Sequence, residues 1–218
     1  MTEVTELSKS DIQGRIAKRV AQELADNSLV NLGIGLPTKV VNYIPDNVTV
    51  TLQSENGFIG LTTADPDNSD PSIVNAGGQP VGIIPGGAFF DSATSFGIIR
   101  GGHVDATVLG ALQVDQYGNI ANYLIPGKMV PGMGGAMDLL VGAKKVIVAM
   151  EHTNKGKFKI LNECTLPLTA SKVVGMIITE MGVFEVVEKG LAVTEIYEGY
   201  TFEEVQKATE VALIDQTK

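Results

Sequence analysis

The chain has 218 residues, 44% of them hydrophobic, which is enough to build one large folded domain. A formal net charge of −9 and a pI near 4.7 argue against nucleic acid or an anionic membrane surface as partner. Residues 1–10 are polar and include acids, which indicates neither a signal nor a transit peptide, and no apolar run approaches membrane-spanning length. We therefore expect a cytoplasmic protein with no membrane partner.

The composition shows no break, flexible linker or internal repeat that would divide the chain. We predict a flexible N-terminal tail over residues 1–9 and a single domain over residues 10–218. The 25 glycines fall in clusters, which predicts several tight backbone loops.

The N-terminal part predicts a helix, a strand and a second helix. Ser10 is the expected N-cap, with Gln13 in the capping-box position, and the helix should reach residues 26–27. Its apolar residues recur every four positions: Ile12, Ile16, Val20 and Leu24. Residues 29–32 form a short strand, and Pro37 suits the first turn of the next helix.

A partial dinucleotide-binding fingerprint lies in this region. Gly33-Ile34-Gly35 follows a strand and precedes a helix, and an acid, Glu55, comes twenty residues after Gly35. The third glycine of the motif is missing because position 38 is threonine. A non-catalytic nucleotide-binding module therefore remains an alternative with weak support.

The stretch from Val48 to Gly60 contains the main candidate for a functional residue. It begins with a β-branched, apolar run typical of a buried strand and reaches Asn56-Gly57, a dipeptide that favours a sharp turn. Glu55 stands between strand and turn, where ligands collect in open α/β sheets. Apolar neighbours could shield its carboxylate: Phe58, Ile59 and Leu61. From position alone, Glu55 is either a structural cap or a reacting group.

The remaining elements alternate between strands and helices. We expect a surface loop (64–72), followed by two short apolar runs (73–74 and 81–84) that are interrupted by Gly77-Gly78 and ended by Pro85-Gly86-Gly87. After a helix capped by Asp91 or Ser92 come a strand (104–109), a hairpin (113–121) and a strand (144–150). The last elements are a helix from Ser171 to about 180, a hairpin (183–187 and 191–196) and a helix from a Thr201/Glu204 capping box to about 212. This order predicts an α/β fold with an open, largely parallel sheet and flanking helices.

Residues 126–138 form a glycine- and proline-rich loop that leads into a helical turn at Ala136. Such a loop can present free backbone N–H groups to a phosphate or to a developing oxyanion. A tight turn without any ligand explains it equally well. Lys128 does not belong to a P-loop, because it lacks the upstream glycine and the following Ser or Thr.

Several chemistries find no matching residues. His103 and His152, the only two histidines, form no metal-ligand pair, so we expect no metal site. The chain has no Gly-x-Ser-x-Gly elbow. Cys164 is the only cysteine, which excludes an intrachain disulfide, and with no activating base near it in sequence we expect a buried, inert thiol. Glu55 is left with few rivals as a nucleophile.

Several motifs resemble the β subunit of family I coenzyme A transferases. The central one is Ser54-Glu55-Asn56-Gly57 followed by Gly60, which resembles the active-site signature of that family. Further matching blocks follow one another through residues 10–210: 31–37, 74–78, 99–103, 125–129, 132–138 and 164–169. The similarity is greatest to the β subunits of 3-oxoacid (acetoacetate-type) and acetate/butyrate coenzyme A transferases.

The resemblance implies a reaction in which Glu55 captures an acyl group from a thioester. It implies that Gly134 and Gly135, with Asn56 and Gly57, bind the oxyanion and the CoA thioester. Asn122 and Lys128 are weaker candidates for contacts to CoA. Coenzyme A would be a substrate, and no cofactor would be bound permanently.

The resemblance also implies a partner. In the family an α subunit of similar fold completes the active site, so we expect an α2β2 enzyme acting on acyl-CoA and short carboxylic acids of unspecified identity. An acyl-CoA hydrolase that uses the same Glu55 with water admitted is the alternative activity.

Overall fold

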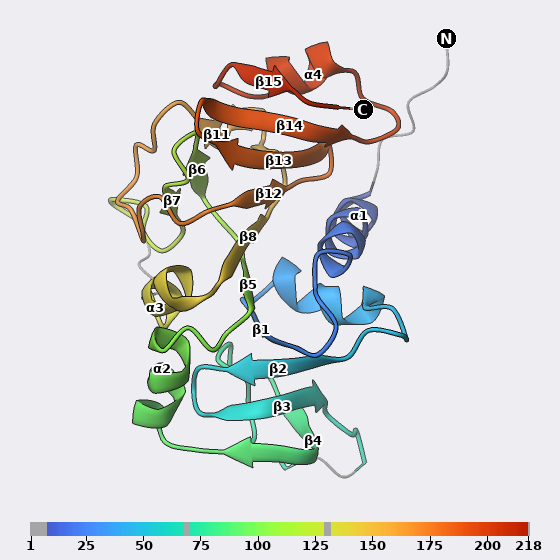
Figure 1. Ribbon diagram of the computed structural model, residues 1–218, viewed down its shortest axis with the longest axis vertical. Helices are drawn as coiled ribbons and strands as arrows, with labels where there is room; N and C mark the ends of the chain where they lie inside the picture. Colours follow the sequence, from blue (N-terminus) through green and yellow to red (C-terminus); the bar gives the residue numbers. More distant parts are fainter. Residues whose placement is uncertain (1–7, 68–69, 129–131, 218) are drawn as a thin grey trace.

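A computed structural model describes residues 8–67, 70–128 and 132–217. Its main feature is a twisted sheet of ten strands that runs through the whole molecule (Figure 1). In spatial order the strands are β15 (Leu213–Asp215), β14 (Gly190–Ile196), β13 (Gly182–Val187), β12 (Met176–Ile178), β8 (Lys145–Ala149), β5 (Ala106–Leu109), β1 (Ser28–Leu32), β2 (Val50–Ser54), β3 (Phe58–Thr63) and β4 (Val81–Phe89).

The middle of the sheet is parallel. Strands β12, β8, β5, β1 and β2 pair in parallel, so their carboxyl ends meet at one edge. Antiparallel pairs flank them, β13 and β14 on one side and β3 and β4 on the other, and β15 adds in parallel to β14. The predicted α/β class with a largely parallel open sheet is confirmed.

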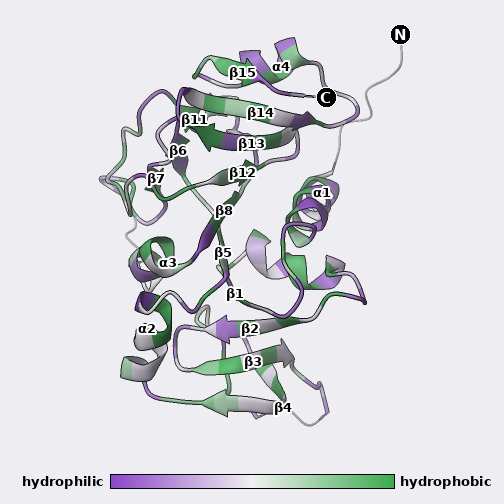
Figure 2. Ribbon diagram, viewed as in Figure 1, coloured by the Kyte–Doolittle hydropathy of each residue, from purple (hydrophilic) through white to green (hydrophobic). Residues whose placement is uncertain are grey.

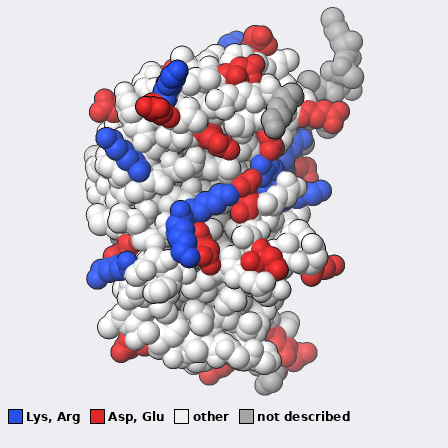
Figure 3. All heavy atoms as spheres, in the orientation of Figure 1, with Lys and Arg blue, Asp and Glu red and all other residues white. Residues whose placement is uncertain are grey.

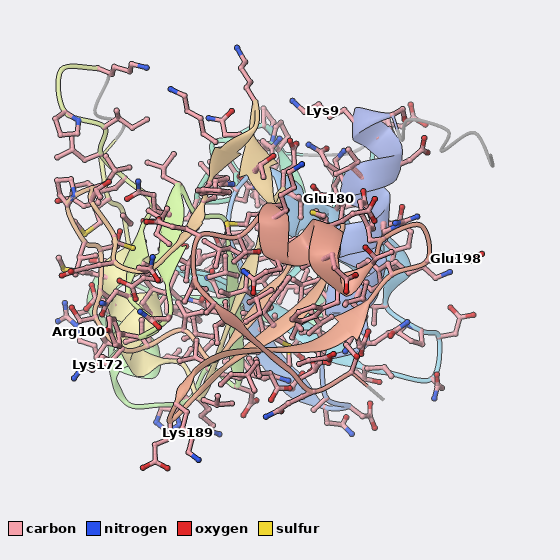
Figure 4. All side chains as sticks on the ribbon, turned by 90° about the horizontal axis from the view of Figure 1, so that it is seen from above. Lys9, Arg100, Lys172, Glu180, Lys189 and Glu198 are labelled. Carbon is pink, nitrogen blue, oxygen red and sulfur yellow. The ribbon has the colours of Figure 1, made fainter. Side chains whose placement is uncertain are left out.

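Helices cover both faces of the parallel strands. Helix α1 (Lys9–Ala21) and the 3₁₀ helix η1 (Leu36–Tyr43) contact each other on one face, and α2 (Ser92–Arg100) and α3 (Ala136–Gly142) lie on the other (Figure 1). Seen from above, Lys9 in α1 and Arg100 in α2 stand on opposite sides of the molecule (Figure 4). Among the described residues, none of the helices has the length and hydrophobicity that a membrane crossing needs.

The remaining elements are short. Helix α4 (Phe202–Lys207) lies beside β15 at the far end of the sheet (Figure 1). Strands β6 (Gln113–Asp115), β7 (Ile120–Ala121) and β11 (Ile160–Leu161) form a small separate sheet, and β9 (Thr153–Asn154) pairs with β10 (Lys157–Phe158).

Strand β8 shows how the sequence builds two cores. Val146 and Val148 belong to the cluster on one face of the sheet, and Ile147 and Ala149 to the cluster on the other. A strand buried on both faces reads as a continuous apolar run, as this one does. Helix α1 completes the second cluster with one apolar stripe, so hydrophobic and hydrophilic residues alternate around it (Figure 2).

Charged groups of both signs stand side by side across the middle of the face shown in Figure 3. Arg19 of α1 binds Glu23 at 2.6 Å and Glu195 of β14 at 2.7 Å, and Lys145 of β8 also contacts Glu23. These ion pairs join helix α1 to two strands of the sheet. Since their groups are partly exposed, we expect each pair to contribute modestly to stability.

The first helix differs from the prediction at both ends. Its N-cap is Ser8, whose Oγ accepts a hydrogen bond from the N–H of Asp11 at 3.2 Å, so Ser10 lies within the helix. Gln13 accepts a hydrogen bond from Lys39 instead of capping. The helix ends at Ala21, before the predicted residues 26–27. Asn27 has φ of +57° and Asp26 accepts a hydrogen bond from the N–H of Thr49 at 2.7 Å, so these two residues belong to the turn before β1. Residues 1–7, most of the predicted tail, lie outside the described residues.

Several other predicted elements are confirmed. The strands β1 and β5, the hairpins β6–β7 and β13–β14, and helix α2 with its Asp91 cap lie where the sequence placed them. Thr201 and Glu204 form the reciprocal capping box of α4.

Three predictions for later elements were also wrong. Residues 171–180 contain strand β12 rather than a helix, because this partly β-branched run fills the place between β8 and β13. Strand β4 continues through Pro85 to Phe89; it is the edge strand, where a proline costs no ladder hydrogen bond. Helix α4 stops at Lys207 instead of about 212, and the chain then adds β15.

His152 is a fully buried histidine that lies between two hydroxyl groups. Its Nδ1 lies 3.0 Å from Thr179 Oγ1 and its Nε2 lies 2.9 Å from Thr209 Oγ1, and its ring packs on Phe184. Burial, with a smaller effect from Lys159, lowers the pKa of His152 to about 4. The side chain is therefore neutral in the folded protein near pH 7.

We predict that His152 makes the protein less stable as the pH falls. Its unfolded pKa is about 6.5, so between pH 6.5 and 4 the unfolded chain binds the extra proton. From pH 7 to 5.5 the wild type should lose about 1 kcal/mol of unfolding free energy that His152→Gln does not lose. Urea denaturation at the two pH values measures the difference. The same change at exposed His103 is the matched control, and an equal pH dependence in wild type and His152→Gln would contradict the prediction.

Candidate active site

The turn after β2 places Glu55 at the carboxyl end of a parallel strand. Ser54 pairs with Phe58 of β3, and the N–H of Gly57 donates to the carbonyl of Ser54 at 3.1 Å. Gly57 has φ of +128°, and a side chain there would come within 2.4 Å of the carbonyl oxygen of Phe90. Only glycine fits this position, so the turn and the place of Glu55 depend on it.

Glu55 lines a cavity of about 460 Å³. The cavity is formed where the chain leaves β1 and β5 and where it enters α3. Besides Glu55 and Ala76, the lining residues come from three segments: 31–34, 109–112 with 122–123, and 132–136 with Leu139. The expected shield of Phe58, Ile59 and Leu61 is not part of this lining; Phe58 packs on Phe89 of β4 instead.

Gly134 and Gly135 lie in the same cavity as Glu55. A methyl group added to Gly135 would lie 2.8 Å from Cγ of Glu55, so backbone and carboxylate side chain are in close contact. Gly134 has φ of +54°, in the region that favours glycine. Within the described part of the chain, the N–H groups of Gly134 and Gly135 have no hydrogen-bond acceptor. The loop thus presents backbone donors beside a carboxylate.

Three polar side chains that were not predicted as site residues are connected by hydrogen bonds to the backbone of Glu55. Asn31 of β1, Gln53 of β2 and Ser95 of α2 are buried, with exposed fractions of 2%, 3% and 0%. They are joined by hydrogen bonds, and the hydroxyl of Ser95 donates to the backbone carbonyl of Glu55 at 2.8 Å. The available signal was Gln53, a long polar side chain in a strand whose preceding residues are β-branched or apolar.

The neighbours of Glu55 in the signature shape the turn. The side-chain amide of Asn56 donates to the carbonyl of Val74 at 2.8 Å, and the N–H of Ala76 donates to Ser54 Oγ at 3.1 Å. These hydrogen bonds join the turn to residues 74–76. Asn56 and Gly57 do not belong to the cavity lining, so their predicted contacts to the oxyanion or thioester stay predictions.

The two weaker candidates lie in different places. Asn122 lines the cavity; its side chain donates to the carbonyl of Gly110 at 3.3 Å and accepts from Thr169 at 2.7 Å. Lys128 is exposed, closes a turn with Ile125, and is not part of the lining. The structure therefore brings Glu55, Gly134, Gly135 and Asn122 together, without Lys128.

Cys164 is a poor nucleophile. The thiol is half-buried, and burial, with a further effect from Asp115, raises its pKa to about 12. A thiol with so high a pKa is protonated near neutral pH. The expectation that this cysteine is chemically inert agrees with its surroundings.

A second cavity adjoins the first. It has a volume of about 540 Å³ and shares Leu32, Ile34 and Ala76 with the cavity of Glu55. Its lining contains no charged residue. Among the described residues, Glu55 is therefore the only carboxylate that lines either of the two adjoining cavities.

The sequence matches a family and several relatives over most of its length. Residues 14–208 match the family model "Coenzyme A transferase". The chain is 62% identical over 200 residues to the β subunit of the acetate CoA-transferase of Haemophilus influenzae, covering 91% of this chain and 90% of the relative. It is 50% identical to the corresponding subunit of the probable succinyl-CoA:3-ketoacid coenzyme A transferase of Bacillus subtilis, covering 90% and 92%.

Solved structures share the fold at lower identity. The acyl-CoA transferase YdiF of Escherichia coli O157:H7 superposes with a TM-score of 0.76 at 22% identity; the alignment covers 97% of this chain and 43% of that longer one. The glutaconate coenzyme A-transferase of Acidaminococcus fermentans gives 0.68 at 17% identity, covering 94% and 86%. The decarboxylase AibA/AibB gives 0.69 at 18% identity, so the fold alone does not specify the reaction.

The family match and the identities agree with the motifs around Glu55, and the resemblance predicted from the sequence is confirmed. Nothing in these relatives favours the nucleotide-binding or hydrolase alternatives. The chain belongs to the coenzyme A transferase family, and it matches β subunits of that family over nearly their whole length.

Proposed function

We propose that this chain is the β subunit of an enzyme that moves coenzyme A from a short-chain acyl-CoA or 3-oxoacyl-CoA to a free carboxylic acid. The observation that carries the proposal is the position of Glu55: a carboxylate at the end of β2, in a cavity, against the backbone of Gly135. We further propose that Glu55 is the nucleophile, and that Gly134 and Gly135 supply the amide donors.

The first half of the reaction loads coenzyme A onto Glu55. A carboxylate oxygen of Glu55 attacks the thioester carbon of the acyl-CoA; the C–S bond breaks and gives an acyl-glutamyl anhydride and a CoA thiolate. The thiolate then attacks the glutamyl carbon of the anhydride. The donor acid leaves as its carboxylate, and a glutamyl-CoA thioester remains.

The second half reverses these steps with a different acid. The acceptor carboxylate attacks the glutamyl-CoA thioester, which gives a new anhydride and again a CoA thiolate. The thiolate attacks the acceptor's carbonyl carbon, releases the acceptor acyl-CoA and restores the carboxylate of Glu55. The cycle is a ping-pong exchange that consumes no water and needs no resident cofactor.

A carboxylate suits this chemistry better than a hydroxyl. A serine would form an ordinary ester and lose the transfer potential of the thioester, whereas an anhydride retains it. Each attack produces a tetrahedral oxyanion, which backbone N–H donors beside Glu55 can stabilise. Water has to be kept away from the anhydride, because hydrolysis would end the transfer.

Coenzyme A carries several negative charges, while this chain has a net charge of −9. Local donors must therefore receive its phosphates. Asn122, which lines the cavity, remains a candidate for such a contact. Lys128 would have to bind a part of CoA that extends beyond the cavity.

We also propose an α subunit as obligatory partner, in an α2β2 enzyme of the cytoplasm. The relatives from Haemophilus influenzae and Bacillus subtilis are each named as one subunit of a transferase, which supports a two-subunit enzyme. Their names include acetate and succinyl-CoA:3-ketoacid transferases, which supports short carboxylic acids as the acceptor class.

Replacing the proposed nucleophile should abolish transfer. In the reconstituted enzyme we expect Glu55→Gln to lower kcat by about ten-thousandfold or more, because an amide cannot form the anhydride. The assay measures acyl-CoA formation from a donor acyl-CoA and an acceptor acid. Exposed Glu188→Gln is the matched control and should keep wild-type rates. Substantial turnover by Glu55→Gln would refute the proposal.

Crowding the carboxylate should also slow the reaction. Gly135→Ala adds a methyl group 2.8 Å from Cγ of Glu55, so the carboxylate must shift and the backbone donors lose their alignment. We expect kcat to fall about a hundredfold. Gly97→Ala in α2 is the control, since a methyl group there meets no atom within 4 Å. If the two variants had equal kcat, close contact at Gly135 would be irrelevant to catalysis.

The purified chain should be inactive until its partner is added. We expect exchange activity only when the α subunit of the same enzyme is present, with the active species eluting at the mass of α2β2. Activity assays of gel-filtration fractions test both points together. Full activity from the lone chain would show that no partner completes the site.

A further inference from the structure

A directional chain of buried hydrogen bonds ends on the backbone of Glu55. The side-chain amide of Asn31 donates to Gln53 Oε1 at 2.6 Å, and Gln53 Nε2 donates to Ser95 Oγ at 3.2 Å. The hydroxyl of Ser95 donates to the carbonyl oxygen of Glu55 at 2.8 Å. This series of hydrogen bonds thus runs from Asn31, which lines the cavity, through Gln53 of β2 and Ser95 of α2 to Glu55.

Each bond in this chain determines the next. Ser95 has one hydroxyl proton, and it goes to Glu55, so Ser95 can only accept from Gln53. Gln53 must therefore turn its amide nitrogen toward Ser95 and its oxygen toward Asn31. Asn31 also donates to the main-chain oxygen of Gln53 at 3.2 Å, which anchors the start of the chain.

Polar groups in such a place need an explanation. The three side chains are at most 3% exposed, and burying them costs free energy unless each finds a partner. A small apolar residue at position 95 would pack in the same place without that requirement. What the hydroxyl adds is one hydrogen bond to the backbone carbonyl of Glu55, in addition to the close contact of the Glu55 side chain with Gly135.

We propose that Ser95 is a positioning residue for Glu55, held in its orientation by Gln53 and Asn31. The hydrogen bond to the carbonyl keeps the Glu55 backbone fixed, so the carboxylate stays against Gly134 and Gly135 during both nucleophilic attacks. This inference rests on the function proposed above, in which Glu55 forms a glutamyl-CoA thioester.

The test measures formation of the glutamyl-CoA thioester in the enzyme reconstituted from this chain and its α subunit. Rapid mixing with acyl-CoA, followed by borohydride reduction and mass spectrometry of the peptide with residue 55, gives its rate. We expect Ser95→Ala to lower this rate and kcat by about 10- to 100-fold, because small misplacements of reacting groups have effects of this size. The KM for acyl-CoA should change less than twofold.

A second variant separates positioning from stability. Ser95→Ala leaves the amide of Gln53 without an acceptor, which alone can destabilise the fold. The double variant Gln53→Met/Ser95→Ala removes that unsatisfied group, while Asn31 keeps the main-chain oxygen of Gln53. We expect its melting temperature to match or exceed that of Ser95→Ala, with the thioester still forming slowly.

Thr107→Val is the matched control. Thr107 Oγ1 in β5 is buried and has no hydrogen-bond partner among the described residues, so its loss should leave the rate unchanged. Recovery of the wild-type rate in the double variant, or a Ser95→Ala rate within twofold of wild type, would overturn the positioning role alone. Absence of the borohydride-reduced residue 55 in the wild-type enzyme would instead overturn the proposed function, and this inference with it.

Discussion

The site depends on two contacts of Glu55, one made by its backbone carbonyl and one made by its side chain. Its carbonyl oxygen accepts the hydroxyl of Ser95 at 2.8 Å, and its side chain lies so close to Gly135 that an added methyl group would be 2.8 Å away. The residue after next, Gly57, allows no side chain because of the carbonyl of Phe90. These contacts restrict the backbone and the side chain of Glu55, which would preorganise its carboxylate for the proposed attack on a carbonyl carbon.

The sheet explains why such a place exists. Five parallel strands bring their carboxyl ends to one edge, where loops from β1 and β5 and the turn after β2 meet. The change from parallel to antiparallel pairing at β3 lets the chain reverse at once after Ser54. A crossover helix at this point would place residue 55 in a longer, less constrained connection. The tight hairpin and the parallel edge together define the position of Glu55.

Local sequence patterns predicted two of the helix caps and the motifs of the site. The features that they did not predict depend on contacts between residues far apart in the sequence. The Asp91 cap and the Thr201/Glu204 capping box depend on residues three apart, and both are found. Residues 171–180 supply β12 because of their neighbours β8 and β13, which no local pattern reveals. In the same way, Glu55 and the glycine loop were visible as motifs, whereas the chain from Asn31 to Ser95 joins residues 22 and 42 positions apart.

The surroundings of Glu55 also bear on the need for a partner. Within the described residues, Ile34 lines both adjoining cavities and is still 67% exposed, and Glu55 itself is only partly buried. An anhydride at this carboxylate would be open to hydrolysis if water reached it freely. An apolar side chain that is two-thirds exposed, such as Ile34, gains only part of its possible burial in the lone chain, and exposed apolar surface often marks an interaction site. The chemistry and the exposure of Ile34 thus both support the proposed α subunit, whose surface would cover the cavity of Glu55.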